Sequence, residues 1–288
     1  MLKLQTVICA VDFSELSKRE LQLAVEVCQA FGARLLVHHN MAGAAPGFAR
    51  EWEWKGVHRG GLSMAKVQEQ LQAVLAEVSK GIRAEATVTA GPVVPVMLQV
   101  VEQVGADLVI VGSHGWSTED HASVAERLIE RCPCPVLTLQ EAKDAPPPFH
   151  LRAQDGVAPT KVVVPTDFSP SASRAVAYAF DLARAVPVTL HLVHVLTGKE
   201  SDTEAAAATR KLHEMVPAEL TDKVECHLPV GNPVEQIIGF IGKSGAELVI
   251  MGEHARSFFR RLFTKDTARE VLHRSAAPVW FVPEAKSA

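Results

Sequence analysis

The 288-residue sequence has no long apolar run. No stretch approaches the roughly 18 apolar residues that a membrane-spanning helix requires. The first residues also lack the combination of a cationic segment, a long apolar stretch and a small-residue cleavage site that marks an export signal. We therefore predict a soluble, cytoplasmic protein that neither spans nor binds a membrane.

The chain also has little net charge and few cysteines. A formal charge of -4 gives no broad basic field, which argues against a nucleic-acid partner. Five cysteines are an odd number, which argues against a disulfide framework. Cys132 and Cys134 are closer in sequence than a usual metal-binding pair, so we interpret them as buried hydrophobic residues.

An internal repeat organises the chain. The sequence Asp-Phe-Ser begins at Asp12 and again at Asp167, 155 residues later. Two apolar segments that end at His39 and His194 keep the same spacing. A shared set of motifs in one order indicates two copies of a unit.

The spacing between the copies changes further along the chain. Gly112 and Gly252 close similar segments only 140 residues apart, so the first copy carries 15 extra residues, which we place within residues 41–62. The proline-rich stretch between the copies is typical of a linker. The predicted organisation is a first domain at residues 1–141, a linker at 142–159 and a second domain at 160–288.

Strand-like and helix-like segments alternate within each copy. Short runs rich in β-branched residues are typical of strands that a parallel sheet buries on both faces. Between them, apolar residues recur at helical spacing, as at Leu21, Ala24, Val25 and Cys28. The order βαβαβαβαβ requires parallel strands and crossover helices, so we predict an α/β fold of two tandem doubly wound domains with five-stranded parallel sheets.

The helix after the Asp-Phe-Ser turn has polar residues that can cap it. Ser14 or Ser17 can serve in the first copy, with Ser17 and Glu20 in capping-box spacing. Ser169 precedes Pro170 in the second copy, which is typical of a cap followed by a first-turn proline.

The carboxyl ends of these strands are the expected ligand position. In doubly wound sheets, ligands bind at that edge, where the strand order reverses. Asp12, His39 and Gly112 all lie at such strand ends.

At these residues the chain resembles the universal stress protein family, whose fold is adenine nucleotide alpha hydrolase-like. The resemblance covers both copies and includes Ala-Asp-Leu-Val-Ile-Val-Gly-Ser-His-Gly, which ends at Gly115. ATP-binding members carry Gly-x-x-Gly, nine residues and then Gly-Ser or Gly-Thr, whose backbone amides approach phosphate oxygens. The resemblance implies these nucleotide-binding residues in the first copy: Ala10, Val11, Asp12, His39, Gly112, His114, Gly115, Ala122 and Ser123.

Both copies depart from the phosphate-binding motif. In the first copy only six residues separate Gly115 from Ala122, and Glu119 and Asp120 add negative charge where a triphosphate would lie. In the second copy Ala255 replaces the second glycine. The second-copy equivalents, which we predict to be degenerate, are Asp167, Gly252, Lys265 and Asp266.

Two kinds of polar residue at these strand ends have more than one interpretation. Asp12 can contact a nucleotide or accept hydrogen bonds within its own turn, and for Asp167 the turn is favoured. The histidines at 38, 39, 58, 114 and 121 have no carboxylate or cysteine at a recognisable ligand spacing, so we predict no metal site.

The predicted function follows from the resemblance and from these departures. We expect a non-enzymatic stress-response protein with degenerate nucleotide sites, which acts through its conformation or through an unidentified protein partner. The sequence establishes no cofactor with certainty, and ATP or AMP is the candidate. One alternative is an ATP- or AMP-binding switch in the first domain with at most slow hydrolysis. Another is an adaptor that uses Trp52, Trp54 and the basic residues Arg256, Arg260, Arg261 and Lys265.

The last strand of each copy suggests how the copies assemble. Family members resemble dimers joined through their last strands, which implies an internal pseudo-dimer here. The segments Val136–Leu139 and Val279–Val282 are the edges that can pair and so cover their unpaired backbone groups. A homodimer of whole chains stays open.

Overall fold

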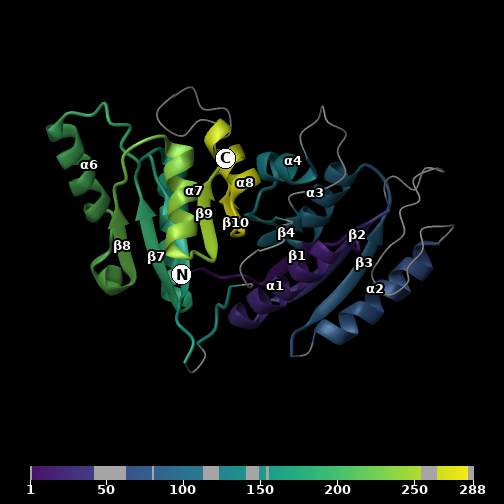
Figure 1. Cartoon of the computed structure of the whole chain (residues 1–288). Helices are drawn as coiled ribbons and strands as arrows, with labels where there is room; N and C mark the ends of the chain where they lie inside the picture. Colours follow the sequence, from purple (N-terminus) through teal and green to yellow (C-terminus); the bar gives the residue numbers. More distant parts are fainter. Residues whose placement is uncertain are drawn as a thin grey trace. The chain divides into compact units, whose positions relative to one another are not determined.

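The computed structural model describes residues 2–41, 63–79, 81–112, 123–140, 149–153, 156–253 and 265–284. The chain divides into two compact units, one of Lys3–Glu141 and the other of Ala142–Ala288 together with Met1–Leu2. We call them the first and second unit. Each is a parallel β-sheet with helices packed on it (Figure 1).

The first unit has a doubly wound sheet in the order β3-β2-β1-β4-β5, with every described pairing parallel. The order reverses between β1 and β4, the two strands at whose ends the ligand site is expected. Its elements are β1 (Thr6–Ala10), α1 (Glu15–Phe31), β2 (Arg34–Asn40), α2 (Met64–Val78), β3 (Ala84–Thr89), α3 (Val93–Val104), β4 (Leu108–Gly112), α4 (Val124–Arg131) and β5 (Val136–Leu139).

The second unit repeats this topology in the order β8-β7-β6-β9-β10. The prediction of two α/β domains with five-stranded parallel sheets is therefore confirmed. Its elements are β6 (Thr160–Pro165), α5 (Pro170–Ala185), β7 (Val188–Val193), α6 (Asp202–Glu214), the 3-10 helix η1 (Ala218–Lys223), β8 (Val224–His227), α7 (Pro233–Ser244), β9 (Leu248–Gly252), α8 (Lys265–Arg274) and β10 (Val279–Val282).

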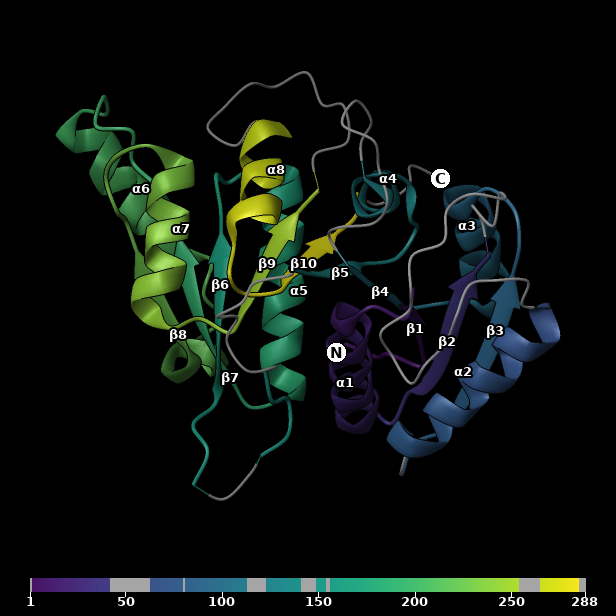
Figure 2. The same cartoon turned by 45° about the vertical axis from the view of Figure 1, so that its right-hand side comes forward.

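Helices lie on both faces of each sheet. In the first unit α1 and α2 contact each other on one face, and α3 and α4 contact each other on the opposite face. In the second unit α5 packs on β6, β7, β9 and β10, and Figure 2 shows α7 and α8 on the opposite face. The central strands are therefore covered on both sides, and Val7, Ile8 and Cys9 have no exposed surface.

The helix starts show which capping residues are used. Ser14 is the N-cap of α1, and Ser169 is the N-cap of α5 directly before Pro170. Ser17 does not form a capping box with Glu20, because Ser17 lies within α1, where its hydroxyl donates to Asp12 Oδ1. Of the two candidate caps in the first copy, the structure selects Ser14.

Part of the predicted linker is packed. Phe149 and Leu151 are buried, and the backbone N–H of His150 donates to Thr160 Oγ1 over 3.0 Å. This described part of the linker therefore lies against folded structure. None of the helices in the described ranges is both long enough and apolar enough to cross a membrane.

Candidate functional site

The Asp-Phe-Ser turn at the end of β1 and of β6 holds a strained backbone. Phe13 and Phe168 have φ angles of 65° and 62°, in the left-handed region that bulky residues avoid. Such a conformation costs about 1–3 kcal/mol and persists only where the surroundings fix it. In both units the phenylalanine ring packs on a strand-end histidine, with centroid distances of 4.8 Å to His39 and 4.4 Å to His194.

The two strand-end histidines brace this turn. His39 Nδ1 lies 2.8 Å from the carbonyl oxygen of Val11, and His194 Nδ1 lies 2.8 Å from that of Thr166. A carbonyl oxygen only accepts, so Nδ1 carries the proton in both histidines. Both side chains are buried. The structure therefore assigns His39 a role in holding the turn beside Ala10 and Val11.

Asp12 and Asp167 accept hydrogen bonds from their own turns. Asp12 Oδ1 accepts from the N–H of Ser14 over 2.9 Å and from the hydroxyl of Ser17 over 2.8 Å. Asp167 Oδ1 accepts from the N–H of Ser169 over 2.9 Å. The turn role that sequence reasoning left open for Asp12 is present in both units, and the exposed Asp12 side chain keeps access to solvent.

Glu20 is a buried acid that sequence reasoning did not place in this site. Glu20 is only 3% exposed. Its carboxyl group lies close to Gly112, because a Cβ atom added at Gly112 would lie 2.5 Å from Glu20 Oε1. Burial, and next the negative charge of Asp12, raises the pKa of Glu20 to about 8, although a hydrogen bond with Ser17 acts in the opposite direction. The acid is therefore mainly protonated at neutral pH.

The second unit has different chemistry at the same place. Ala175 stands where the repeat register puts the counterpart of Glu20. A Cβ atom at Gly252 would overlap the backbone carbonyl of Ser171, so α5 itself closes against the end of β9. Glu253, the next residue, is only 8% exposed and brings an acidic group to the end of that strand. Lys211 Nζ lies 4.4 Å from the centroid of the Phe168 ring.

Ser123 is occupied as a helix cap. Its hydroxyl accepts from the N–H of Glu126 over 3.2 Å, and its own N–H donates to Glu126 Oε2 over 2.7 Å. This reciprocal pair is a capping box at the start of α4. The structure thus places Ser123 at a helix N-terminus, where the phosphate motif requires its last residue.

Several predicted site residues lie outside the described residues. They are His114, Gly115, Ala122, the loop with Trp52 and Trp54, and the basic residues Arg256, Arg260 and Arg261; the side chains of Lys265 and Asp266 are likewise not described. Among the predicted residues, those the structure brings together at the strand ends of the first unit are Val11, Asp12, His39 and Gly112.

A second group of polar side chains lies on β7 and β8. His191, Glu225 and His227 have potential ligand atoms that all lie within 4.8 Å of one another. Sequence reasoning missed this group because it considered only histidines of the first copy. The sequence feature that could have revealed the group is the spacing of Glu225 and His227. They are two residues apart in a short strand, and this spacing places both side chains on one face.

Comparison with known proteins gives one consistent family. The universal stress protein family model matches residues 3–140 and 159–283. Universal stress protein Slr1230 of Synechocystis is 27% identical over 177 residues, which are 60% of this chain and 56% of that protein. Universal stress protein Rv2005c of Mycobacterium tuberculosis is 28% identical over 209 residues, 65% of this chain and 64% of that protein. The chain thus matches less than two thirds of the length of these two relatives.

A solved structure supports the fold over the whole chain. A universal stress protein from Archaeoglobus fulgidus superposes with a TM-score of 0.69 at 22% identity, covering 98% of this chain and 97% of that one. A second, from Pseudomonas aeruginosa, gives 0.65 at 15% identity and covers 98% of this chain and 94% of that one.

Proposed function

This chain belongs to the universal stress protein family, and from that membership we propose a stress-response protein without enzymatic activity. In this proposal both nucleotide sites are degenerate, and the protein acts through its conformation or through a protein partner. One contrast between the two sites carries the proposal. The Asp-Phe-Ser turn and the strand-end histidine that supports it, which we call the frame, are repeated in both units. The residues that would contact a phosphate differ between them.

The frame is nearly identical in the two units. The bond from the strand-end histidine to the turn carbonyl is 2.8 Å in each, and the bond from the turn serine N–H to the aspartate is 2.9 Å in each. Both turns also keep the positive φ angle. Such agreement supports a turn retained for the stability of the strand end, because the bonds within each turn need no ligand.

The groups that would meet phosphate have diverged. Glu253 follows Gly252 in the second unit, where the first unit has Ser113. A buried carboxylate beside a triphosphate either stays negative and repels the phosphates, or must first take up a proton. Both alternatives lower the affinity for ATP. In the first unit the sequence shortens the loop after Gly115 and adds Glu119 and Asp120. These changes support loss of ATP affinity in both units.

Calorimetric titration with ATP and with AMP tests the degenerate sites. We expect no micromolar binding of ATP to the purified chain and no release of phosphate above the buffer rate. The decisive comparison uses Gly115→Val in the first unit and Ala255→Val at the matching position of the second. Micromolar ATP binding that Gly115→Val abolishes and Ala255→Val preserves would establish the alternative, a nucleotide switch in the first unit.

One observation favours the first unit for that alternative. Gly112 ends β4, and Ser123 begins α4 as a buried N-cap, so both ends of the family's phosphate loop survive there. Glu20 is mainly neutral at pH 7 and adds little charge to this site. If a nucleotide binds, AMP should therefore bind better than ATP, because its phosphate carries less charge past Glu119 and Asp120.

We also propose that the two units form an internal pseudo-dimer. Within its own unit, β5 pairs with β4 and β10 pairs with β9, so each is the last strand of a five-stranded sheet. The edge of a parallel sheet carries unpaired N–H and C=O groups that need cover. Pairing of β5 with β10 would supply that cover for both units.

A further inference from the structure

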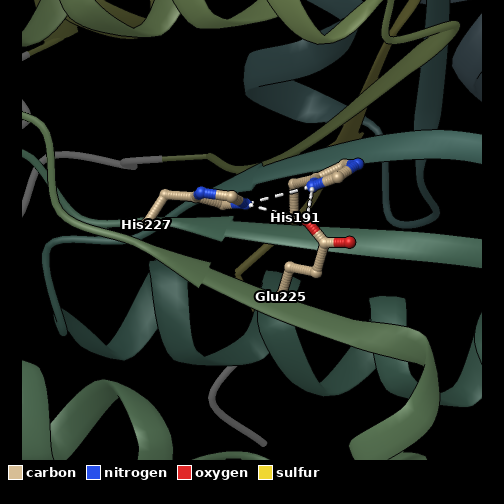
Figure 3. Close-up of side chains that lie close together, drawn as sticks. All are labelled: His191, Glu225 and His227. Carbon is tan, nitrogen blue, oxygen red and sulfur yellow. Dashed lines mark hydrogen bonds and ion pairs between the residues drawn. The ribbon is translucent and has the colours of Figure 1, made fainter.

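Three side chains of the second unit converge on a common point. His191 of β7 is in register with Glu225 of β8, and His227 lies two residues beyond Glu225, so all three emerge on one face of the sheet. His191 Nδ1 lies 3.1 Å from His227 Nε2 and 3.3 Å from Glu225 Oε2. The third side of this triangle, from His227 Nε2 to Glu225 Oε2, is 3.5 Å (Figure 3).

These separations fit the ligand shell of a divalent metal ion. Two ligands about 2.1 Å from zinc at a tetrahedral angle are about 3.4 Å apart. Hydrogen bonds can account for two sides of the triangle at most, because two N–H groups that both donate to Glu225 Oε2 leave no hydrogen bond between the rings. A metal ion contacts all three atoms at once. Two imidazoles and one carboxylate are also the ligand set of zinc sites that keep an open position.

The surroundings hold the two imidazole rings and leave one side open. Phe240 of α7 packs against both rings, with centroid distances of 4.5 Å to His227 and 5.8 Å to His191. The His191 side chain is only 9% exposed, whereas that of Glu225 is 60% exposed. An ion can therefore enter from the side of Glu225, and water can occupy a further coordination position.

The electrostatics favour neutral imidazoles. Burial lowers the pKa of His191 and of His227, an effect that the carboxylate of Glu225 opposes in both. A neutral ring has the lone pair that a metal ligand needs. Lys161 is a nearby cation, and its positive charge disfavours a metal at His191; its ammonium group donates to the carbonyl of Ser244 over 3.1 Å.

We propose that His191, Glu225 and His227 bind one divalent transition-metal ion, zinc being the best match to this ligand set. The ion would hold the short strand β8 to β7. The affinity should be below that of closed structural zinc sites, because ligating histidines usually donate their second N–H. His191 Nε2 is buried and has no hydrogen-bond partner among the described residues. This inference is independent of nucleotide binding.

The first unit provides an internal comparison. In its matching strand pair, Leu36 is in register with Glu85, and Thr87 lies two residues beyond. Only the carboxylate is therefore shared, and the proposed site is confined to the second unit. Leu36 and Thr87 show which residues a strand pair of this fold accommodates at the two histidine positions. The matching substitutions in the second unit are His191→Leu and His227→Thr.

Zinc titration tests the proposal. The chain carries no affinity tag and is first freed of metal with a chelator. We expect the wild-type chain to bind a zinc ion that His191→Leu and His227→Thr each bind roughly tenfold or more weakly. Glu225→Gln should also weaken binding. His213→Ala, which removes an exposed histidine of α6, serves as the matched control and should bind as the wild type does.

Two further measurements make the outcome decisive. Circular dichroism establishes that each variant is folded, and zinc should raise the unfolding temperature of the wild type but not that of His191→Leu. Cobalt in place of zinc should give the visible absorption of a four-coordinate site. Absence of zinc binding to the wild type, or equal binding by His191→Leu, His227→Thr and wild type, would overturn the proposal.

Discussion

Glu20 should make the stability of the first unit depend on pH. Its carboxyl group lies against Gly112 and beside Asp12, and burial raises its pKa from 4.5 to about 8. Between these two values the unfolded chain has released the Glu20 proton while the folded chain retains it. The free energy of unfolding therefore falls as pH rises through this range, and the loss is fully developed above pH 8.

Glu20→Gln should remove this pH dependence. An uncharged amide of similar shape needs no proton, so we expect the variant to gain stability over the wild type as pH rises from 5 to 8, by on the order of a few kcal/mol. Urea unfolding at several pH values measures the difference. Glu102→Gln, on the exposed side of α3, is the matched control. A constant difference between Glu20→Gln and wild type across this range would contradict the prediction.

Sequence reasoning identified the turn residues but missed the buried acid Glu20 and the group formed by His191, Glu225 and His227. Asp12, His39 and Gly112 end strands, so their common position follows from the fold class. Glu20 stands at capping-box spacing from Ser17, which suggested a helix cap instead of a buried acid. His191 and Glu225 meet only through the register of β7 with β8, which the spacing along the chain does not contain.

At the scale of elements, local signals predict most boundaries. The predicted last strands Val136–Leu139 and Val279–Val282 agree with β5 and β10 of the structure, and a proline directly precedes each of them. The order of elements predicts a helix in the position of α6, but no residue range was predicted for it. It buries only Leu212 and so lacks an apolar face, and its start is marked by a capping box of Ser201 with Glu204.

The short helix α4 should depend on its cap. The N-cap Ser123 precedes its eight residues and forms a capping box with Glu126. Ser123→Ala removes the acceptor for the Glu126 N–H and should lower the free energy of unfolding by about 1 kcal/mol. Glu126→Gln keeps the box and should cost much less. Thermal unfolding of the two variants checks this order, and equal stabilities would show that the cap is dispensable.

At the scale of the molecule, proteolytic cleavage tests the pairing of the two units. A protease recognition sequence inserted at residue 145 allows the chain to be cut within the predicted linker. If β5 pairs with β10, the two parts should still elute together in gel filtration, because each covers the edge of the other. The uncut chain is the control, and separate elution of the two parts would rule out a stable internal pseudo-dimer.

Duplication within one chain also changes what mutation can do. In a dimer of identical subunits, every substitution appears at both sites simultaneously. Here Glu20 faces Gly112 while the second copy has Ala175, and His191 has Leu36 as its counterpart. One chain therefore carries a fixed one-to-one ratio of two unlike sites, and a substitution in one unit changes that site alone.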